Sequence, residues 1–368
     1  MPEPLLEVKN LRVHFPTEDG IVKAVDGVSF AIQPGETLGV VGESGSGKSV
    51  SFLTVMGLIN RKSALVEGEV IFQGQDLLNV PKEELQAIRG NKIGMIFQDP
   101  MTSLHPFYKV GDQIAETILA HEDISKKEAG ARAVDMLKRV GIPRPDERAR
   151  QYPHEFSGGM RQRAMIAMAL SLNPDLLIAD EPTTALDVTV QAQILELLRD
   201  LNEQTGAAIV LITHNLGVVA GLCKRVLVMY AGEIVEEGTA EQIFESPQHP
   251  YTWSLLRSVP RIDASRHARL LSIEGLPPDL IDLPAGCKFN PRCPFRIERC
   301  FSEAPPTEEV APEQHAACWV TMERAYAEMG ARDIKDTSPG AASGIHPKGR
   351  QQLPAAEVTA AVAEPVGD

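Results

Sequence analysis

Residues 42–49 read GESGSGKS, a glycine-rich run that fits the phosphate-binding pattern G-x-x-x-x-G-K-[ST]. The run follows an apolar stretch at residues 37–41, which predicts a strand, and it precedes a predicted helix from residue 47 to about residue 58. Glycines let backbone N–H groups approach a phosphate closely, and the positive end of a helix favours an anion. The strand, loop and helix together predict a nucleoside-triphosphate site.

Two side chains of this P-loop carry most of its chemistry. Lys48 is expected to reach the β- and γ-phosphates of ATP, and the Ser49 hydroxyl is expected to ligate Mg²⁺. The residues expected to contact the nucleotide here are Gly42, Ser44, Gly45, Ser46, Gly47, Lys48, Ser49 and Val50. An accidental match to the pattern is uncommon, and its placement between a predicted strand and a predicted helix makes an accident less probable still.

A second strand-like run, Leu-Leu-Ile-Ala at residues 176–179, ends in the two acids Asp180 and Glu181. In P-loop proteins an acid at the end of a neighbouring strand holds Mg²⁺, so Asp180 is the candidate metal-binding residue. Glu181 could polarise the attacking water. A strand followed by an acidic loop is common by itself, and only its combination with the P-loop favours the catalytic reading.

The segment Ser157-Gly158-Gly159 precedes a predicted helix at residues 160–170. A hydroxyl, two flexible amides and a helix N-terminus form a second potential anion site. The simpler reading is a helix with Ser157 as its N-cap. Because the P-loop already serves one nucleotide, a second phosphate clamp suggests that this segment faces the ATP of another subunit.

With these motifs in this order, the chain resembles the ABC ATPase family over about residues 5–259. The segment FSGGM at residues 156–160 is similar to the LSGGQ signature of that family, with Phe156 in place of Leu and Met160 in place of Gln. Residues 185–187, Ala-Leu-Asp, resemble its D-loop. The resemblance implies an α/β fold, in which a P-loop NTPase domain combines a mixed sheet with a helical subdomain.

The resemblance also implies roles for residues that the motifs alone leave open. Gln98 resembles the glutamine that senses Mg²⁺ and contacts the membrane domain, and His214 resembles the switch histidine that contacts the γ-phosphate. With Glu181 they form the expected catalytic set. Phe15 is similar to the aromatic residue that stacks on adenine. Two such domains would dimerise head to tail, each P-loop facing the signature segment of the other, and closure of this dimer would move the membrane domains.

The remaining pattern is that of an α/β domain interrupted by a helical insert. Strands are expected at residues 6–15, 22–32, 37–41, 175–179 and 207–213, and a hairpin at 226–236 that turns at Ala231-Gly232. Residues 82–140 carry mostly helical periodicity, for instance at 110–121 and 126–140, and another helix is expected at 188–204. We expect an ATPase domain at residues 1–259, an extension at 260–332, and a disordered tail at 333–368 that is rich in Ser, Pro, Gly and Ala.

The C-terminal third resembles the extension found in ATPases of oligopeptide and dipeptide importers. The similarity rests on His-Pro-Tyr-Thr at residues 249–252, on Gly-Cys-Lys-Phe-Asn-Pro-Arg-Cys-Pro at 286–294 and on Cys300. It includes Met-Thr-Ser-Leu at residues 101–104, after the glutamine loop. Tyr251 and Trp253 are expected to pack the extension onto the main domain. The resemblance implies import of peptides, with a related importer for nickel or another small solute as the alternative.

Four of the five cysteines, Cys287, Cys293, Cys300 and Cys318, lie in this extension, whereas Cys223 stands among apolar residues as a core thiol. Some members of the resembled family hold a [4Fe-4S] cluster here, and four thiolates would suffice. The spacing matches neither ferredoxin runs nor paired C-x-x-C zinc sites, so zinc and free thiols stay open as the second and third readings.

A formal net charge of −14 argues against nucleic acid as a partner. The sequence begins without a basic, then apolar, signal segment, and it contains no uncharged apolar run of membrane-spanning length. We therefore expect a peripheral protein on the cytoplasmic face of the inner membrane. The resemblance implies a second homologous ATPase, two membrane permeases and an external solute-binding protein as partners. The alternatives from other functional classes are a soluble ABC ATPase without transport activity and a P-loop kinase.

Overall fold

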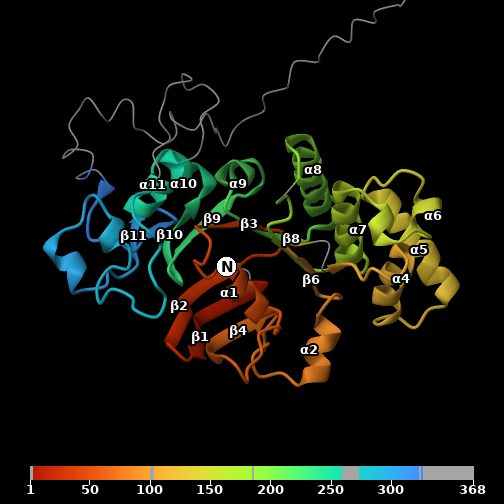
Figure 1. The fold of residues 1–368 in the computed structure, drawn as a ribbon, viewed down its shortest axis with the longest axis horizontal. Coiled ribbons are helices and arrows are strands. Elements are labelled where there is room, and N and C mark those ends of the chain that lie inside the picture. The colour runs from red at the N-terminus through yellow and green to blue at the C-terminus, as the bar shows by residue number, and fades with distance from the viewer. Residues whose placement is uncertain (1–2, 100–102, 185, 259–272, 323–324, 326–368) are drawn as a thin grey trace, which may run out of the picture.

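The computed structural model describes residues 3–99, 103–184, 186–258, 273–322 and 325. The predicted tail at 333–368 lies outside these residues, as does Ala185 of the predicted D-loop. The described residues form two sheets, of which the larger lies across the centre of Figure 1 and the smaller lies below it.

The larger sheet has the order β11-β12-β10-β9-β3-β8-β7-β6. Its centre is parallel, since β3 pairs in parallel with β8 and β9, and β7 pairs in parallel with β8 and β6. The strands are β3 (Thr37–Val41), β6 (Ile93–Ile96), β7 (Leu176–Asp180), β8 (Ala208–Thr213), β9 (Arg225–Tyr230), β10 (Glu233–Thr239), β11 (Glu308–Ala311) and β12 (Gln314–Ala316). The P-loop follows β3, while Asp180 ends β7 and Glu181 follows it, and β8 lies between these two parallel strands. The predicted site residues therefore lie at the carboxyl ends of the parallel strands.

The smaller sheet is antiparallel and has the order β2-β1-β4-β5. It consists of β1 (Leu6–Thr17), β2 (Gly20–Ile32), β4 (Leu65–Phe72) and β5 (Gln75–Asp76). Helix α1 (Lys48–Val55) packs between the two sheets, where Phe52 and Val55 are fully buried. This helix begins where the sequence predicts, but it ends before residue 58.

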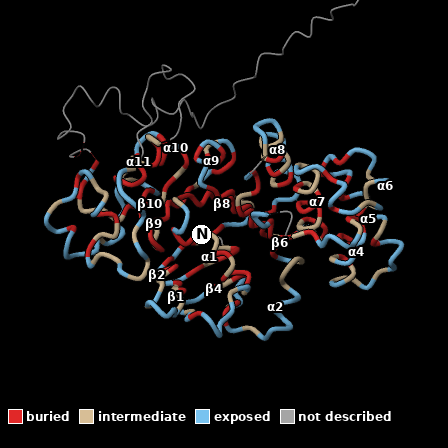
Figure 2. Tube along the Cα trace, in the orientation of Figure 1, coloured by how far each residue is buried: buried red, intermediate tan, exposed pale blue. Residues whose placement is uncertain are grey.

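Alternation along the central strands divides the interior into two cores. In β8, Val210 and Ile212 face the antiparallel sheet and α1, whereas Ile209 and Leu211 face the helices on the other side. Such a strand is covered on both faces and reads as a continuous apolar run. The buried residues accordingly follow the central sheet in Figure 2.

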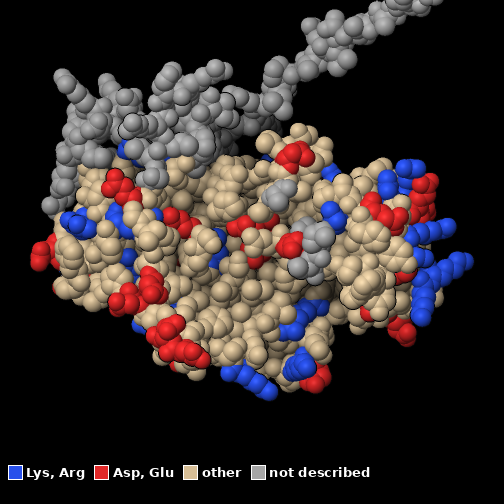
Figure 3. Space-filling model, in the orientation of Figure 1, with Lys and Arg blue, Asp and Glu red and all other residues tan. Residues whose placement is uncertain are grey.

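The helices of the second layer fall into two groups in Figure 1. One group forms the predicted helical subdomain, and the other covers the sheet. The subdomain contains α4 (Val110–Leu119), α5 (Lys126–Arg139), α6 (Pro145–Arg148) and α7 (Gly158–Leu170), and the others are α8 (Val188–Thr205), α9 (Leu216–Leu222), α10 (Ala240–Glu245) and α11 (Pro250–Arg257), with α2 (Lys82–Ile88) after β5. On the face seen in Figure 3, Lys and Arg side chains gather at the far end of this helical subdomain.

Five strands of the described residues, β4, β5, β6, β11 and β12, have no counterpart among the predicted strands, and β6 contradicts the prediction directly. The mostly helical pattern expected over residues 82–140 is wrong at Ile93–Ile96, which is strand β6 at the edge of the larger sheet. All four of its residues are buried. A short continuous apolar run has no periodicity that distinguishes a buried strand from a helix, so pairing with β7 decides the outcome.

The C-terminal extension continues the ATPase sheet. Strand β12 pairs antiparallel with β10, with Glu236 opposite Ala316, and β11 pairs with β12. A small third core joins Trp253 of α11 to Phe295, Val320 and Met322. The division at residue 259 remains a prediction, but the described part of the extension packs directly against the preceding domain.

Candidate nucleotide site

Two glycines set the shape of the P-loop. Gly42 has φ +154°, and a Cβ atom there would lie 2.2 Å from the carbonyl oxygen of Met229. Gly47 has φ +97°, and its Cβ would lie 2.3 Å from the carbonyl oxygen of Ala24. Only glycine fits both the backbone conformation and the space at these positions. The loop is therefore held closely between the backbones of β9 and β2.

Lys48 is buried at the centre of this loop. Its Nζ donates hydrogen bonds of 2.8 Å to the carbonyl oxygens of Gly42 and Glu43, and one of 3.2 Å to the Ser46 hydroxyl. Burial lowers the pKa of Lys48, although the nearby carboxylates of Glu181 and Asp180 oppose the shift. The ammonium group is thus enclosed by the loop that is predicted to hold phosphates.

The predicted Mg²⁺ ligands Ser49 and Asp180 lie side by side, although 131 residues separate them in the sequence. The Ser49 hydroxyl donates a 2.9 Å hydrogen bond to Oδ1 of Asp180, which is buried at the end of β7. Burial raises the pKa of Asp180, and the bond from Ser49 partly offsets this. A hydroxyl and a buried carboxylate are oxygen donors of the kind that Mg²⁺ prefers, so these residues fit the ion.

The three residues of the expected catalytic set meet at the Glu181 carboxylate. Nε2 of Gln98 donates to Oε2 of Glu181 over 2.9 Å, and Nδ1 of His214 lies 2.9 Å from Oε1. The Thr184 hydroxyl also donates to Oε2, at 2.9 Å. Burial alone would raise the pKa of Glu181, but the bonds from His214 and Thr184 outweigh it and the pKa is lowered. Glu181 is therefore ionised near neutral pH.

The backbone at Glu181 is strained. Its φ is +46°, in the left-handed region that a glutamate rarely adopts. The conformation is held by the hydrogen bond from its N–H to the Ile212 carbonyl, 2.8 Å long. Such strain is found preferentially at functional sites, where it fixes a side chain that the chemistry requires.

Ser157, Gly158 and Gly159 lie at the start of α7, away from the P-loop. The Ser157 hydroxyl accepts a 3.3 Å hydrogen bond from the N–H of Met160, as expected for an N-cap. The segment lines a cavity of about 380 Å³ together with Asp187. Within the described part of the chain, this cavity shares no lining residue with the one beside the P-loop, and Figure 1 separates α7 from α1. The structure does not bring the two predicted phosphate sites together in one chain.

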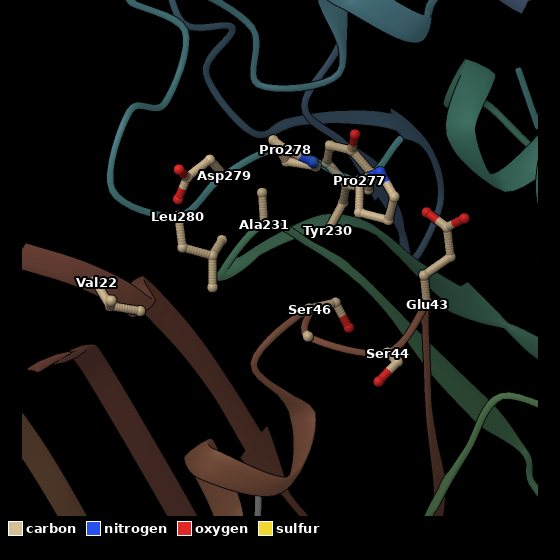
Figure 4. Close-up of a pocket in the computed structure, with 11 residues that line it drawn as sticks. Val22, Glu43, Ser44, Ser46, Tyr230, Ala231, Pro277, Pro278, Asp279 and Leu280 are labelled. Carbon is tan, nitrogen blue, oxygen red and sulfur yellow. The ribbon is translucent and has the colours of Figure 1, made fainter. Parts of the chain in front are cut away.

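The cavity beside the P-loop has a volume of about 340 Å³. Glu43, Ser44, Gly45 and Ser46 line one side of it, and residues 277–280 of the extension line the other (Figure 4). Phe15 is half-buried on β1 and does not line this cavity, but Val22, its partner across the β1–β2 hairpin, does. The stacking of Phe15 on adenine remains a prediction.

The four cysteines of the extension lie near one another. The N–H of Cys287 donates to the carbonyl oxygen of Cys300 over 2.9 Å. Burial raises the pKa of Cys293 to about 12 and that of Cys318 to about 12, and the charges of the other thiols contribute to both shifts. In the described residues, however, no group of three or more His, Cys, Asp or Glu side chains is arranged to hold a metal ion. Cys223 is a buried core thiol, as predicted.

Tyr251 and Arg292 connect the extension to the P-loop. Tyr251 packs on Tyr230 and Phe289, as its predicted packing role requires, but its hydroxyl also accepts a 2.8 Å hydrogen bond from the N–H of Glu43. Arg292 forms an ion pair with the Glu43 carboxylate. Neither contact was predicted, because the motifs that contain Tyr251, Arg292 and Glu43 do not indicate that these residues meet. Thr184 was also missed, because no motif marks it.

Comparison with known proteins decides the family. A model of the ABC transporter family matches residues 25–184, and one of the oligopeptide/dipeptide transporter C-terminal region matches residues 235–300. A dipeptide transport ATP-binding protein of Lactococcus lactis is 54% identical over 88% of this chain and 93% of its own length. The chain belongs to the ATP-binding proteins of ABC transporters. An oligopeptide transport ATP-binding protein of Escherichia coli is 53% identical over 87% of this chain and 94% of its own.

Solved structures confirm the fold of this ABC ATPase. An ATP-binding cassette solved as a dimer in a post-hydrolysis state, with ADP and Pi bound, has a TM-score of 0.59 and 30% identity to it. The match covers 64% of this chain and 98% of that one. None of the helices in the described residues of this ABC ATPase has the length and apolar character needed to span a membrane.

Proposed function

We propose that this ABC ATPase binds MgATP and hydrolyses it to drive the uptake of di- and oligopeptides through membrane permeases. The observation that carries the hydrolytic part is the convergence of Gln98 and His214 on the Glu181 carboxylate, close to Ser49 and Asp180. The cargo is inferred from the relatives, which are named for dipeptide and oligopeptide transport.

Each residue has a role that its position supports. Lys48 would hold the β- and γ-phosphates, while Ser49, Asp180 and Gln98 would hold Mg²⁺, which neutralises charge on the phosphates when bound. Glu181, kept ionised by its hydrogen bonds, would orient and polarise the attacking water. His214 would contact the γ-phosphate from the other side of Glu181. The remaining P-loop residues would bind the phosphates through their backbone N–H groups.

A second subunit would complete the site. Ser157, Gly158 and Gly159 lie at a cavity of their own, away from the P-loop, which supports the proposal that their amides face a phosphate bound to another chain. We infer a head-to-tail pair with a second, homologous ATPase, docked on two permeases at the cytoplasmic face of the membrane and served by an external solute-binding protein. Support comes from the similar cassette that was solved as a dimer.

Transport in a deletion strain tests this function. The chain would be co-expressed with its permeases, and uptake of radiolabelled di- and oligopeptides would be measured beside the matched variant Glu181→Gln. We expect uptake with the natural chain and none with the variant. Uptake of Ni²⁺ without uptake of peptide would favour the related importers. ATPase activity that does not co-purify with membranes when the permeases are co-expressed would favour a non-transport ATPase.

We also propose that Cys287, Cys293, Cys300 and Cys318 form the ligand set of a [4Fe-4S] cluster in the extension, residues 260–332, with zinc as the alternative. The gathering of one buried and three half-buried thiols supports this, although they would have to converge further to bind a metal. Anaerobic purification should give a brown protein with iron and sulfide, and Cys300→Ser should remove both. Stoichiometric zinc in a colourless protein would favour the alternative, and protein that contains neither the cluster nor zinc would show that the four cysteines are free thiols.

A further inference from the structure

Glu43, the second residue of the P-loop, is held by a side chain that follows it by 249 residues. Nη1 of Arg292 donates to Oε2 of Glu43 over 2.6 Å, and Nη2 donates to Oε1 over 3.0 Å. The Arg292 side chain is 4% exposed and that of Glu43 is 26% exposed. A bidentate arginine–carboxylate pair of this kind fixes the orientation of the carboxylate as well as its position.

The main chain of Glu43 is held as well. Its N–H donates to the Tyr251 hydroxyl over 2.8 Å, and its carbonyl oxygen accepts from Nζ of Lys48 over 2.8 Å. Tyr251 is itself fixed between Tyr230 and Phe289, with ring centroids 4.6 and 5.4 Å away. Glu43 thus links Arg292 and Tyr251 on one side to the phosphate-binding lysine on the other.

The loop needs such an external restraint. Gly42, Gly45 and Gly47 all have positive φ, and a Cβ at Gly45 would meet no atom within 4 Å, so packing does not confine the middle of the loop. Glycine-rich backbone loses more conformational freedom on ordering than any other. Contacts that order it before ATP binds would reduce the entropic cost of binding.

The extension also approaches the same loop from a second direction. Residues 277–280 face the P-loop across the cavity of about 340 Å³, as Figure 4 shows for Pro277, Pro278, Asp279 and Leu280. This segment is anchored to β2, since the N–H of Lys23 donates to the Leu280 carbonyl over 3.1 Å. Two parts of the extension therefore meet at one face of the P-loop.

We propose that Arg292 is a positioning residue of the ATP site, which holds the P-loop through Glu43 in its nucleotide-binding form and so sets the affinity for ATP. The inference rests on the proposed ATPase function. Within the described part of the chain, Arg292 forms hydrogen bonds with Glu43, Tyr230 and the backbone of the extension, and not with Gln98, Glu181 or His214. Its loss should consequently weaken binding and leave the chemical step nearly intact.

The test compares ATP binding and ATPase kinetics of the full chain, reconstituted with its permeases, for Arg292→Gln, Glu43→Gln, the double variant and Arg292→Lys. We expect KM for MgATP to rise about tenfold in each single variant, equivalent to about 1.4 kcal/mol, with kcat within about twofold. The double variant should be no worse than either single one, because both remove the same pair. Arg292→Lys should recover part of the affinity.

Arg299→Gln is the matched control, because Arg299 lies in the same extension and its partner Glu303 is exposed. It should leave KM unchanged. An unchanged KM in a folded Arg292→Gln would overturn the proposal. A double variant in which the effects of the two single substitutions on KM add up would overturn it as well. If Arg292→Gln does not fold, Glu43→Gln tests the pair from the P-loop side. A natural chain that binds no ATP would instead refute the proposed function.

Discussion

Nδ1 of His214 and Nε2 of Gln98 contact opposite oxygens of the Glu181 carboxylate, each over 2.9 Å. These three residues come from the ends of β8, β6 and β7, which are neighbours or next neighbours in the sheet. Oε2 also accepts from Thr184, whereas Oε1 has His214 as its one partner among the described residues, so Oε1 keeps an acceptor site for a water. The orientation and hydrogen bonding of the Glu181 carboxylate therefore depend on the two loops that carry Gln98 and His214.

Replacing Glu181 with Gln should stop hydrolysis and spare ATP binding. The amide keeps the size of the side chain and one acceptor oxygen but cannot act as a base, and general-base catalysis contributes about 10²- to 10⁴-fold. We expect kcat to fall by about that factor, with ATP retained in a stable dimer on size-exclusion chromatography. Normal turnover would remove Glu181 from the catalytic set.

Replacing Lys48 with Ala should abolish ATP binding. The substitution removes the only side chain that bonds to the carbonyls of Gly42 and Glu43 in the described residues, and with it the expected phosphate contact. Isothermal titration with ATP should detect no binding, while circular dichroism should show an intact fold. Near-normal ATPase activity would refute the role of the P-loop.

Replacing Ser157 with Asp separates the two readings of the α7 N-terminus. Aspartate is as good an N-cap as serine, so the thermal midpoint should change little. Its negative charge would face the phosphates of a partner subunit, so ATPase activity of the reconstituted complex should fall by at least about tenfold. Ser125→Asp, at the N-cap of α5, is the matched control and should retain full activity. Full activity in Ser157→Asp would leave only the capping role.

The buried carboxyl group of Glu236 should make the stability of the folded protein depend on pH. It is buried and accepts hydrogen bonds from the N–H groups of Gln248 and His249 and from Nε2 of Gln314, at 2.7, 2.9 and 2.9 Å. Burial raises the pKa of this carboxyl from 4.5 to about 7. The folded state thus holds a proton that the unfolded state releases, and the free energy of unfolding should fall as pH rises from about 4.5 to about 7.

Glu236→Gln should remove that part of the pH dependence. Thermal midpoints measured between about pH 5 and about pH 8 should fall less in the variant than in the natural chain. The exposed Glu241, in the first turn of α10, gives the control substitution Glu241→Gln, which should behave as the natural chain. Parallel pH profiles for Glu236→Gln and the natural chain would contradict the assignment.

The sequence predicts the motif residues and their elements well, because each motif is local. Lys48, Asp180, Glu181 and Ser157 lie where the spacing of strands, loops and helices places them. Contacts between segments that lie far apart in the sequence could not be predicted in this way. The pair of Arg292 with Glu43 joins residues that share no motif, and β6 is a strand only because β7 lies beside it. Such contacts depend on tertiary packing, which a single sequence does not display.

The pairing of β12 with β10 has a consequence for synthesis of the chain. Strand β10 belongs to the ATPase sheet, yet in the part of the chain that the structure describes its outer edge is paired with Gln314–Ala316, far downstream. Until the ribosome has released that segment, or in a fragment that stops short of it, the edge presents unpaired N–H and C=O groups to any other strand. In the finished protein the outermost strand, β11, instead carries Glu308 and Glu309, whose charges oppose edge-to-edge association.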